Sequence, residues 1–307
     1  MNYELNEINQ AIYEKYERFC HEFYSANTYR SYLKGFMMVA KWVEEKLGKQ
    51  LLQLTKEEAK AFLDELTFAK NEKGEWRLKT NTLERRRSAF TSIYNYLETE
   101  YHIENPFLDL VIEREDEEKP KEEVLYLTDA QINDLLLALK THSQNDFLAK
   151  RDVFMTRLVI STGITIEELI DLKLHQLDFT NEQLTLADRR VLPLSKKLEA
   201  GYREYLALRE AYALKNPTNQ DHVFISLRGG LLSSQNNNAT LRKAGKIAEI
   251  PFMVSTSVLR HTYAVRQLKG HVPVETVSKR LGHQRLYYTM RTYAPFITEA
   301  QHQDLAI

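Results

Sequence analysis

The chain has 307 residues, enough for two domains of ordinary size, and 43% of them are hydrophobic, so a sizeable core can form. Its 42 basic and 43 acidic residues nearly cancel, which excludes a protein that coats nucleic acid with uniform positive charge but allows local basic surfaces. The single cysteine, Cys20, excludes a disulfide framework and a cysteine-based zinc site.

Helical spacing of apolar residues dominates the first half of the chain. Residues 8–47 follow this spacing throughout. Thr55, followed three residues later by Glu58, predicts a capping box at the start of the next helix. A turn is expected at 71–76 and a further helix at 80–99. We therefore expect an all-helical first domain.

Residues 113–123, "EREDEEKPKEE", contain seven acids, three bases and a proline, with no apolar residue. Such a stretch buries nothing, and it predicts an exposed linker. The expected division is a helical domain at 1–112, the linker at 113–123, and a second domain at 124–307.

The second half begins with a helix capped by Thr128 and a buried helix that ends at Gly163. The segments that follow are a short helix at 166–174, strands at 175–179, 183–187 and 190–194, a helix at 195–214, a strand at 222–226, and helices to the end. The predicted fold class is mainly α with a small antiparallel β-sheet, in two domains.

Basic residues gather near the C-terminus. Between Ser257 and Tyr293 the only acid is Glu275, whereas seven residues are basic: Arg260, Arg266, Lys269, Lys279, Arg280, Arg285 and Arg291. A phosphate backbone would be attracted to this segment. A solvated helix face is the alternative that composition leaves open.

Motif order in this segment resembles the tyrosine recombinase (phage integrase) family. The family's second box is H-x-L-R-H, followed by L-G-H and then a tyrosine. Here "SVLRH" leads to "LGH" and then to "TMRTY", which ends on Tyr293. Upstream, "TGITIEEL" resembles the first box, T-G-L-R-x-S-E-L, and "RVLPL" resembles a strand that ends in V-P-L. The first half resembles the family's helical core-binding domain, so the likeness covers nearly the whole chain.

The resemblance implies site-specific DNA recombination, with strands cut and rejoined through a 3′-phosphotyrosyl intermediate and with no metal or other cofactor. Tyr293 would be the nucleophile, Arg260 a phosphate ligand and His283 an active-site donor. The implied partners are double-stranded DNA and further copies, as a tetramer on paired sites, or another recombinase. DNA integration by a mobile element belongs to this expectation.

Three family positions hold other residues. Thr165 stands where the first-box arginine is expected, Ser257 where the second-box histidine is expected, and Asp188 where a hairpin lysine is expected. Loss of one such donor costs on the order of 10²- to 10³-fold in rate. Arg189 and Arg190, in the shortened hairpin, are candidate substitutes for the missing charge.

Other side chains receive less specific expectations. His261 is expected not to take part in catalysis: the resemblance implies a packing or hydrogen-bonding residue at this position, and a histidine inside a helix commonly satisfies a backbone group. Phe296 and Ile297 are expected to anchor the C-terminal tail on a neighbouring subunit. Phosphate contacts that position a duplex are expected from four residues of the first domain, Lys79, Arg85, Arg86 and Arg87.

Three functions remain open at this stage. The first is an active recombinase or integrase. The second is a catalytically impaired DNA-binding regulator, or a structural partner of an active recombinase, on the same fold. The third is a helical protein that binds no DNA. The polar start is unlike a signal peptide and no apolar run approaches a membrane span, so we expect a cytoplasmic protein without membrane contact.

Overall fold

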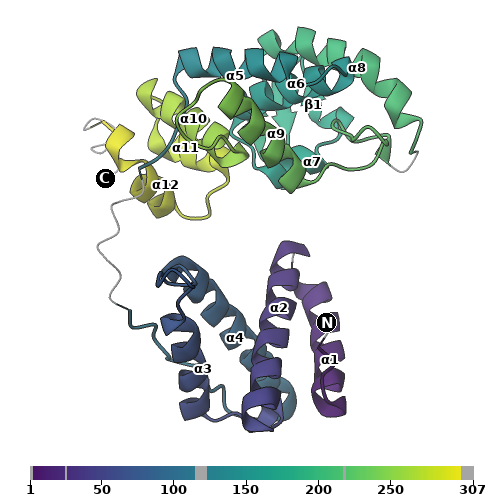
Figure 1. Ribbon diagram of the computed structural model, residues 1–307. Helices are drawn as coiled ribbons and strands as arrows, with labels where there is room; N and C mark the ends of the chain where they lie inside the picture. The colour runs from purple at the N-terminus through teal and green to yellow at the C-terminus, as the bar shows by residue number, and fades with distance from the viewer. Residues whose placement is uncertain (1–2, 25, 115–122, 217–218, 299–307) are drawn as a thin grey trace. The chain divides into compact units, whose positions relative to one another are not determined.

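The computed structural model describes residues 3–24, 26–114, 123–216 and 219–298. The chain divides into two compact units, Met1–Pro120 and Lys121–Ile307 (Figure 1). Of the predicted linker, residues 115–122 lie outside the described residues.

Unit 1, the N-terminal unit, is helical, as the sequence predicts. Its elements are α1 (Glu7–Phe23), α2 (Ala26–Trp42), a π-helical turn η1 (Val43–Leu47), a 3₁₀ turn η2 (Leu51–Gln53), α3 (Lys56–Phe68) and α4 (Thr80–Tyr101). The predicted capping box of α3 is confirmed: Thr55 accepts a bond from the Glu58 amide, and the Glu58 carboxylate accepts one from the Thr55 amide. Helix α2 packs on both α1 and α4.

The core of unit 1 is rich in aromatic rings. Phe62, Phe90 and Phe107 contact one another around a common centre, and Tyr94 stacks at an angle on Phe107. The buried Tyr94 hydroxyl donates to the carbonyl oxygen of Leu51 at 2.9 Å, so its polar atom is satisfied.

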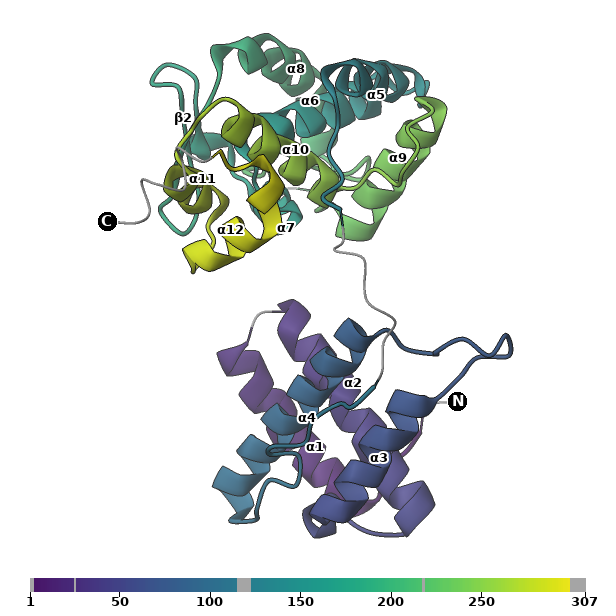
Figure 2. The ribbon, with the colours of Figure 1, turned by 90° about the vertical axis from the view of Figure 1, so that its left-hand side faces the viewer.

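Unit 2, the C-terminal unit, contains the remaining elements of the described chain. Its helices are α5 (Asp129–Thr141), α6 (Asp146–Thr162), α7 (Ile166–Asp171), α8 (Glu199–Ala213), α9 (Ser234–Ile247), α10 (Thr256–Lys269), α11 (Val274–Leu281) and α12 (Leu286–Tyr293), with 3₁₀ turns η3 (Leu174–Gln176), η4 (Lys196–Leu198) and η6 (Ala294–Phe296). Helix α6 packs against α5, α8 and α10, and it forms the centre of the unit. Figure 2 shows α10, α11 and α12 gathered on one side of this centre.

One antiparallel sheet is formed by the chain segment between α7 and α8. It has the order β1 (Leu177–Asp178), β2 (Gln183–Thr185) and β3 (Val191–Pro193). In its register Leu184 faces Leu192, and both side chains are buried. The three predicted strands therefore exist but are shorter than expected, and the predicted fold class is confirmed.

The strand predicted at 222–226 is wrong. His222 forms only an isolated bridge with Lys173. The carbonyl oxygens of His222 and Val223 accept bonds from the buried guanidinium of Arg209, and Val223 also accepts from the Tyr205 hydroxyl. The Val223 amide donates to the Leu172 oxygen and the Leu174 amide donates to the Asp221 oxygen, so main-chain pairing is limited to this one bridge, and side chains satisfy the carbonyls of His222 and Val223.

The first residues of the C-terminal tail pack within their own unit, and their contact with a neighbouring subunit stays a prediction. Ile297 is 9% exposed and lies in the same cluster as Tyr293 and Leu281, within its own unit. The Phe296 ring meets Tyr126 edge-on, with centroids 5.3 Å apart. These residues therefore complete the core of unit 2. Residues 299–307 lie outside the described residues.

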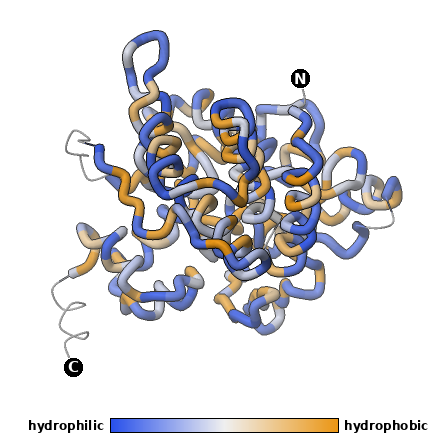
Figure 3. Tube along the Cα trace, turned by 90° about the horizontal axis from the view of Figure 1, so that it is seen from below, coloured by the Kyte–Doolittle hydropathy of each residue, from blue (hydrophilic) through white to orange (hydrophobic). Residues whose placement is uncertain are grey.

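Hydrophobic and hydrophilic residues are interspersed along the chain (Figure 3). Among the described residues, the helices are all too short or too polar to cross a bilayer.

Candidate active site

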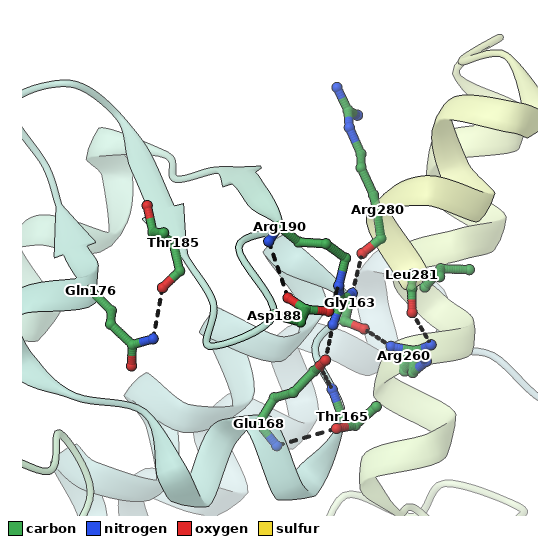
Figure 4. A network of polar contacts seen from close by, with 10 residues as sticks. All are labelled: Gly163, Thr165, Glu168, Gln176, Thr185, Asp188, Arg190, Arg260, Arg280 and Leu281. Atoms are coloured by element: carbon green, nitrogen blue, oxygen red, sulfur yellow. Dashed lines mark hydrogen bonds and ion pairs between the residues drawn. The ribbon is translucent and has the colours of Figure 1, made fainter. Parts of the chain in front are cut away.

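Arg260 lies at the meeting point of three segments of unit 2. It follows the N-cap of α10, where Ser255 accepts a bond from the Val258 amide. Its guanidinium donates from Nη1 to the Gly163 carbonyl oxygen and from Nη2 to the Leu281 carbonyl oxygen, each at 2.5 Å (Figure 4). It therefore joins the ends of α6 and α11 to the start of α10.

Both of these helix ends require glycine. Gly163 has φ +71°, and a Cβ there would lie 2.3 Å from a ring carbon of Tyr263. Gly282 also has φ +71°, and a Cβ there would lie 2.6 Å from Cζ of Arg190. The glycines of the T-G and L-G-H motifs thus serve left-handed helix ends and close packing at once.

Tyr293 is the last residue of α12 and is 2% exposed. Its hydroxyl lies 2.8 Å from Nδ1 of His261, on α10. Burial raises the pKa of Tyr293 to about 12, although the nearby charge of Arg260 acts in the opposite direction. The phenol is therefore protonated near neutral pH and has a hydrogen-bond partner on its oxygen.

The two histidines of the site are uncharged near neutral pH. Burial, followed by the charge of Arg260, lowers the pKa of His261. Burial and the charges of Arg260, Arg190 and His261 lower the pKa of His283 to about 4. The Nδ1 atom of His283 lies 2.7 Å from the hydroxyl of the buried Thr289, which orients the ring.

Arg190 reaches the same place from the β2–β3 turn. It donates from Nη1 to the Arg280 carbonyl oxygen at 2.9 Å and from Nε to Asp188 at 2.5 Å, and Nη2 pairs with Glu168 (Figure 4). Arg189 has φ +66° and is exposed. Of the two candidate substitutes, Arg190 faces the site.

The three positions that depart from the family pattern have local roles or face solvent. Thr165 caps α7: its hydroxyl accepts a bond from the Glu168 amide at 3.2 Å. Asp188, at the hairpin-lysine position, holds Arg190. Ser257 lies one helical turn before Arg260 and is exposed.

The predicted DNA contacts of unit 1 point in different directions along α4. Lys79 and Arg85 are exposed. Arg86 is half-buried beside Met38, and burial together with the charge of Arg77 lowers its pKa. Arg87 pairs with Glu84 and donates to the Leu110 carbonyl oxygen at 3.2 Å, so its guanidinium binds partners within its own unit.

The partner of His261 is the feature of this site that the sequence did not predict. A histidine inside a helix is a common packing residue, and only the fold brings it to the tyrosine 32 positions later. The doublet Arg260-His261 in the second box is the sequence signal that could have marked His261 as a candidate site residue. Within the described ranges, three or more His, Cys, Asp or Glu side chains nowhere gather closely enough to hold a metal ion.

The chain is similar to known proteins over most of its length. Residues 126–296 match the model of the phage integrase family, and residues 19–101 match that of the phage integrase N-terminal SAM-like domain. The tyrosine recombinase XerC of Anoxybacillus flavithermus is 25% identical over 272 residues, which cover 87% of this chain and 86% of that protein.

Solved structures show the same fold at low sequence identity. The XerH site-specific recombinase bound to its difH substrate aligns with a TM-score of 0.67 at 14% identity, over 96% of this chain and 83% of that one. The Tn1549 transposon integrase in complex with circular intermediate DNA aligns with a TM-score of 0.64 at 18% identity, over 97% and 99% of the two chains.

Proposed function

Since this chain belongs to the phage integrase family of tyrosine recombinases, we propose that it cuts and rejoins DNA strands at specific sites through Tyr293. The observation that carries the proposal is the 2.8 Å contact between the Tyr293 hydroxyl and the uncharged imidazole of His261, beside the guanidinium of Arg260. A phenol, a base and a phosphate ligand are the minimum set for nucleophilic attack on a phosphodiester.

In the proposed step the Tyr293 oxygen forms a bond to phosphorus. Its proton passes to Nδ1 of His261, which the lowered pKa keeps free to accept it. The bond from phosphorus to the 5′-oxygen breaks, and that oxygen takes a proton from water to become a hydroxyl. Asp188 occupies the place of the family's lysine, so no cationic acid is available from that position.

Charge on the phosphate is offset by Arg260, whose planar fork suits two oxygens. His283 contributes as a hydrogen-bond donor rather than as an acid, because its pKa of about 4 leaves it neutral. When the Thr289 hydroxyl donates to Nδ1, the proton of His283 resides on Nε2, where it can reach a phosphate oxygen.

DNA binding is proposed to involve both units. In unit 1, Lys79 and Arg85 are exposed and available for phosphate contacts that position the duplex. The XerH and Tn1549 integrase structures contain DNA, which supports duplex DNA as the partner here. We propose a tetramer on paired sites as the recombining assembly.

The competing function is a DNA-binding regulator, or a structural partner of an active recombinase, that no longer cuts DNA. The carboxylate of Asp188 at the lysine position and the capping role of Thr165 favour it. It predicts tight, salt-sensitive binding of duplex DNA without covalent attachment.

Nicked suicide duplexes carrying sites from DNA that flanks the gene distinguish the two functions. Covalent protein–DNA adduct is measured on a denaturing gel, with Tyr293→Phe as the matched control. An adduct that disappears in Tyr293→Phe supports the recombinase. Binding without adduct in both proteins would instead establish the regulator.

A further inference from the structure

Two guanidinium groups bind successive carbonyl oxygens at the C-terminal end of α11. Arg190 donates to the Arg280 oxygen at 2.9 Å, and Arg260 donates to the Leu281 oxygen at 2.5 Å. Carbonyls at a helix C-terminus lack partners within the helix and carry partial negative charge, so they attract cations. Figure 4 shows both heads beneath this helix end, with the Arg280 side chain directed away.

The shape of the β2–β3 turn determines which arginine reaches this place. The Leu186 amide donates to the Arg190 oxygen, and the Arg189 amide donates to the Leu186 oxygen, each at 2.9 Å. Arg189 takes the left-handed conformation, φ +66°, that closes such a bulged turn. As a result, the side chain of Arg189 is exposed while that of Arg190 is directed inward.

Two carboxylates and one main-chain oxygen together bind all three nitrogens of the Arg190 guanidinium. Asp188 binds Nε and Glu168 binds Nη2, while the main chain binds Nη1. The Glu168 carboxylate is itself held by the Thr165 amide at 2.7 Å. Among the described residues these bonds use three of the five N–H groups of Arg190, so two remain for a ligand.

The charge arrangement points to an anionic ligand. The two guanidinium groups lie near each other because they bind successive carbonyl oxygens of α11, and burial together with the charge of Arg260 lowers the pKa of Arg190. The Tyr293 hydroxyl contacts His261, the residue next to Arg260 in α10, and the charge of Arg260 acts to lower the pKa of Tyr293. Glu168 and Asp188 already offset the charge of Arg190, so an anion here would be attracted chiefly by Arg260 and by the two remaining N–H groups of Arg190.

We propose that Arg190 is the second phosphate ligand of this active site, and that it replaces from the β2–β3 turn the guanidinium that Thr165 does not supply. Arg190 and Arg260 together bind the non-bridging oxygens of the scissile phosphate and stabilise the charge that develops during Tyr293 attack. Glu168 and Asp188 are positioning residues. The inference rests on the proposed strand cleavage.

The first test removes the guanidinium at position 190 and introduces one at position 165. Single-turnover adduct formation on the nicked duplex is measured for wild type, Arg190→Ala, and Arg190→Ala combined with either Thr165→Arg or Thr165→Ala. Arg190→Ala should slow cleavage by about 10²- to 10³-fold. In the Arg190→Ala background, Thr165→Arg should raise the cleavage rate by at least about tenfold. Thr165→Ala, which loses the same helix cap, should leave that rate unchanged. Arg189→Ala, which removes the adjacent exposed charge, should leave the rate within about twofold.

The second test does not depend on cleavage. In the Tyr293→Phe background, the affinity for duplex DNA is measured with a normal or a methylphosphonate group at the scissile position, with and without Arg190→Ala. If Arg190 binds this phosphate, the neutral group weakens binding by the parent but has a smaller effect once Arg190 is removed. A residue that only holds the turn in place would give additive effects.

The outcomes distinguish failure of the proposed strand cleavage from failure of the assignment of Arg190 as a phosphate ligand. Wild type without adduct removes the proposed function, while the methylphosphonate series still decides whether Arg190 binds the phosphate. An Arg190→Ala protein that cleaves at the wild-type rate, or that responds to methylphosphonate as its parent does, would overturn the assignment.

Discussion

The contact between Gly282 and Arg190 makes a quantitative prediction about stability. Gly282→Ala places a non-glycine residue at φ +71°, which costs about 1 kcal/mol. The new Cβ would also lie 2.6 Å from Cζ of Arg190, so the guanidinium must move. That movement gives up its bonds to Glu168 and to the Arg280 oxygen. For a partly exposed charged group we take this loss as about 2 kcal/mol.

A double-mutant cycle isolates the free energy that is lost when the Arg190 guanidinium is displaced. Gly282→Ala should cost about 3 kcal/mol in the wild-type background but only about 1 kcal/mol in Arg190→Ala, where no side chain is displaced. The free energy of unfolding is measured by urea denaturation of the whole chain, followed by far-ultraviolet circular dichroism.

Tryptophan fluorescence provides an internal control in the same titration. Both tryptophans, Trp42 and Trp76, lie in unit 1, so their transition should not shift in these variants. If Gly282→Ala costs the same in both backgrounds, within about 0.5 kcal/mol, the described packing of Arg190 on Gly282 is refuted.

Other predictions follow from the charged and titratable residues. His261→Gln should slow adduct formation by about 10²- to 10⁴-fold, and a variant that cleaves at the wild-type rate would show that His261 is not the base. Because the pKa of His261 is lowered, the wild-type cleavage rate should decline only below about pH 6.5. The hydrogen bond to Asp152 raises the pKa of His142, so its stabilising contribution is complete below about pH 6.5 and is lost as pH rises through the raised value. Wild type should therefore lose more stability than His142→Gln when urea titrations at pH 6 and pH 9 are compared, and equal losses would contradict this role. Arg85→Ala should reduce the salt dependence of duplex binding by about one unit of slope, whereas Arg87→Ala should instead lower the stability of unit 1, because Arg87 bonds within it. Salt titrations and urea titrations of the same two variants check both statements.

Much of the local structure could be predicted from short stretches of sequence. Thr55 with Glu58 begins a helix, and Gly163 ends one, because capping depends on residues within a single turn. The family likeness also belongs to the sequence, since the order and spacing of its motifs do not depend on tertiary contacts. For the same reason the mainly helical fold with one small sheet could be predicted in advance.

The failures of prediction involve partners that are distant in the chain. The segment 222–226 has the composition of a strand, but its carbonyls bind the side chains of Arg209 and Tyr205, which no local pattern reports. Ile297 lies in one apolar cluster with residues of α10 and α11, a contact within the unit that the sequence did not predict.

The active site divides in the same way. Motif spacing predicts Arg260, His283 and Tyr293 as site residues, and it marks Thr165, Ser257 and Asp188 as departures from the family pattern. Whether Arg189 or Arg190 faces the site depended on a left-handed residue in a bulged turn and on the free carbonyls of a helix 90 residues away. The contact of His261 with the Tyr293 hydroxyl depended on the packing of α10 against the end of α12. Sequence therefore determined which chemical groups this protein possesses. Only tertiary structure decided which of them meet, because the direction of a side chain is set by contacts between segments that are far apart in the chain.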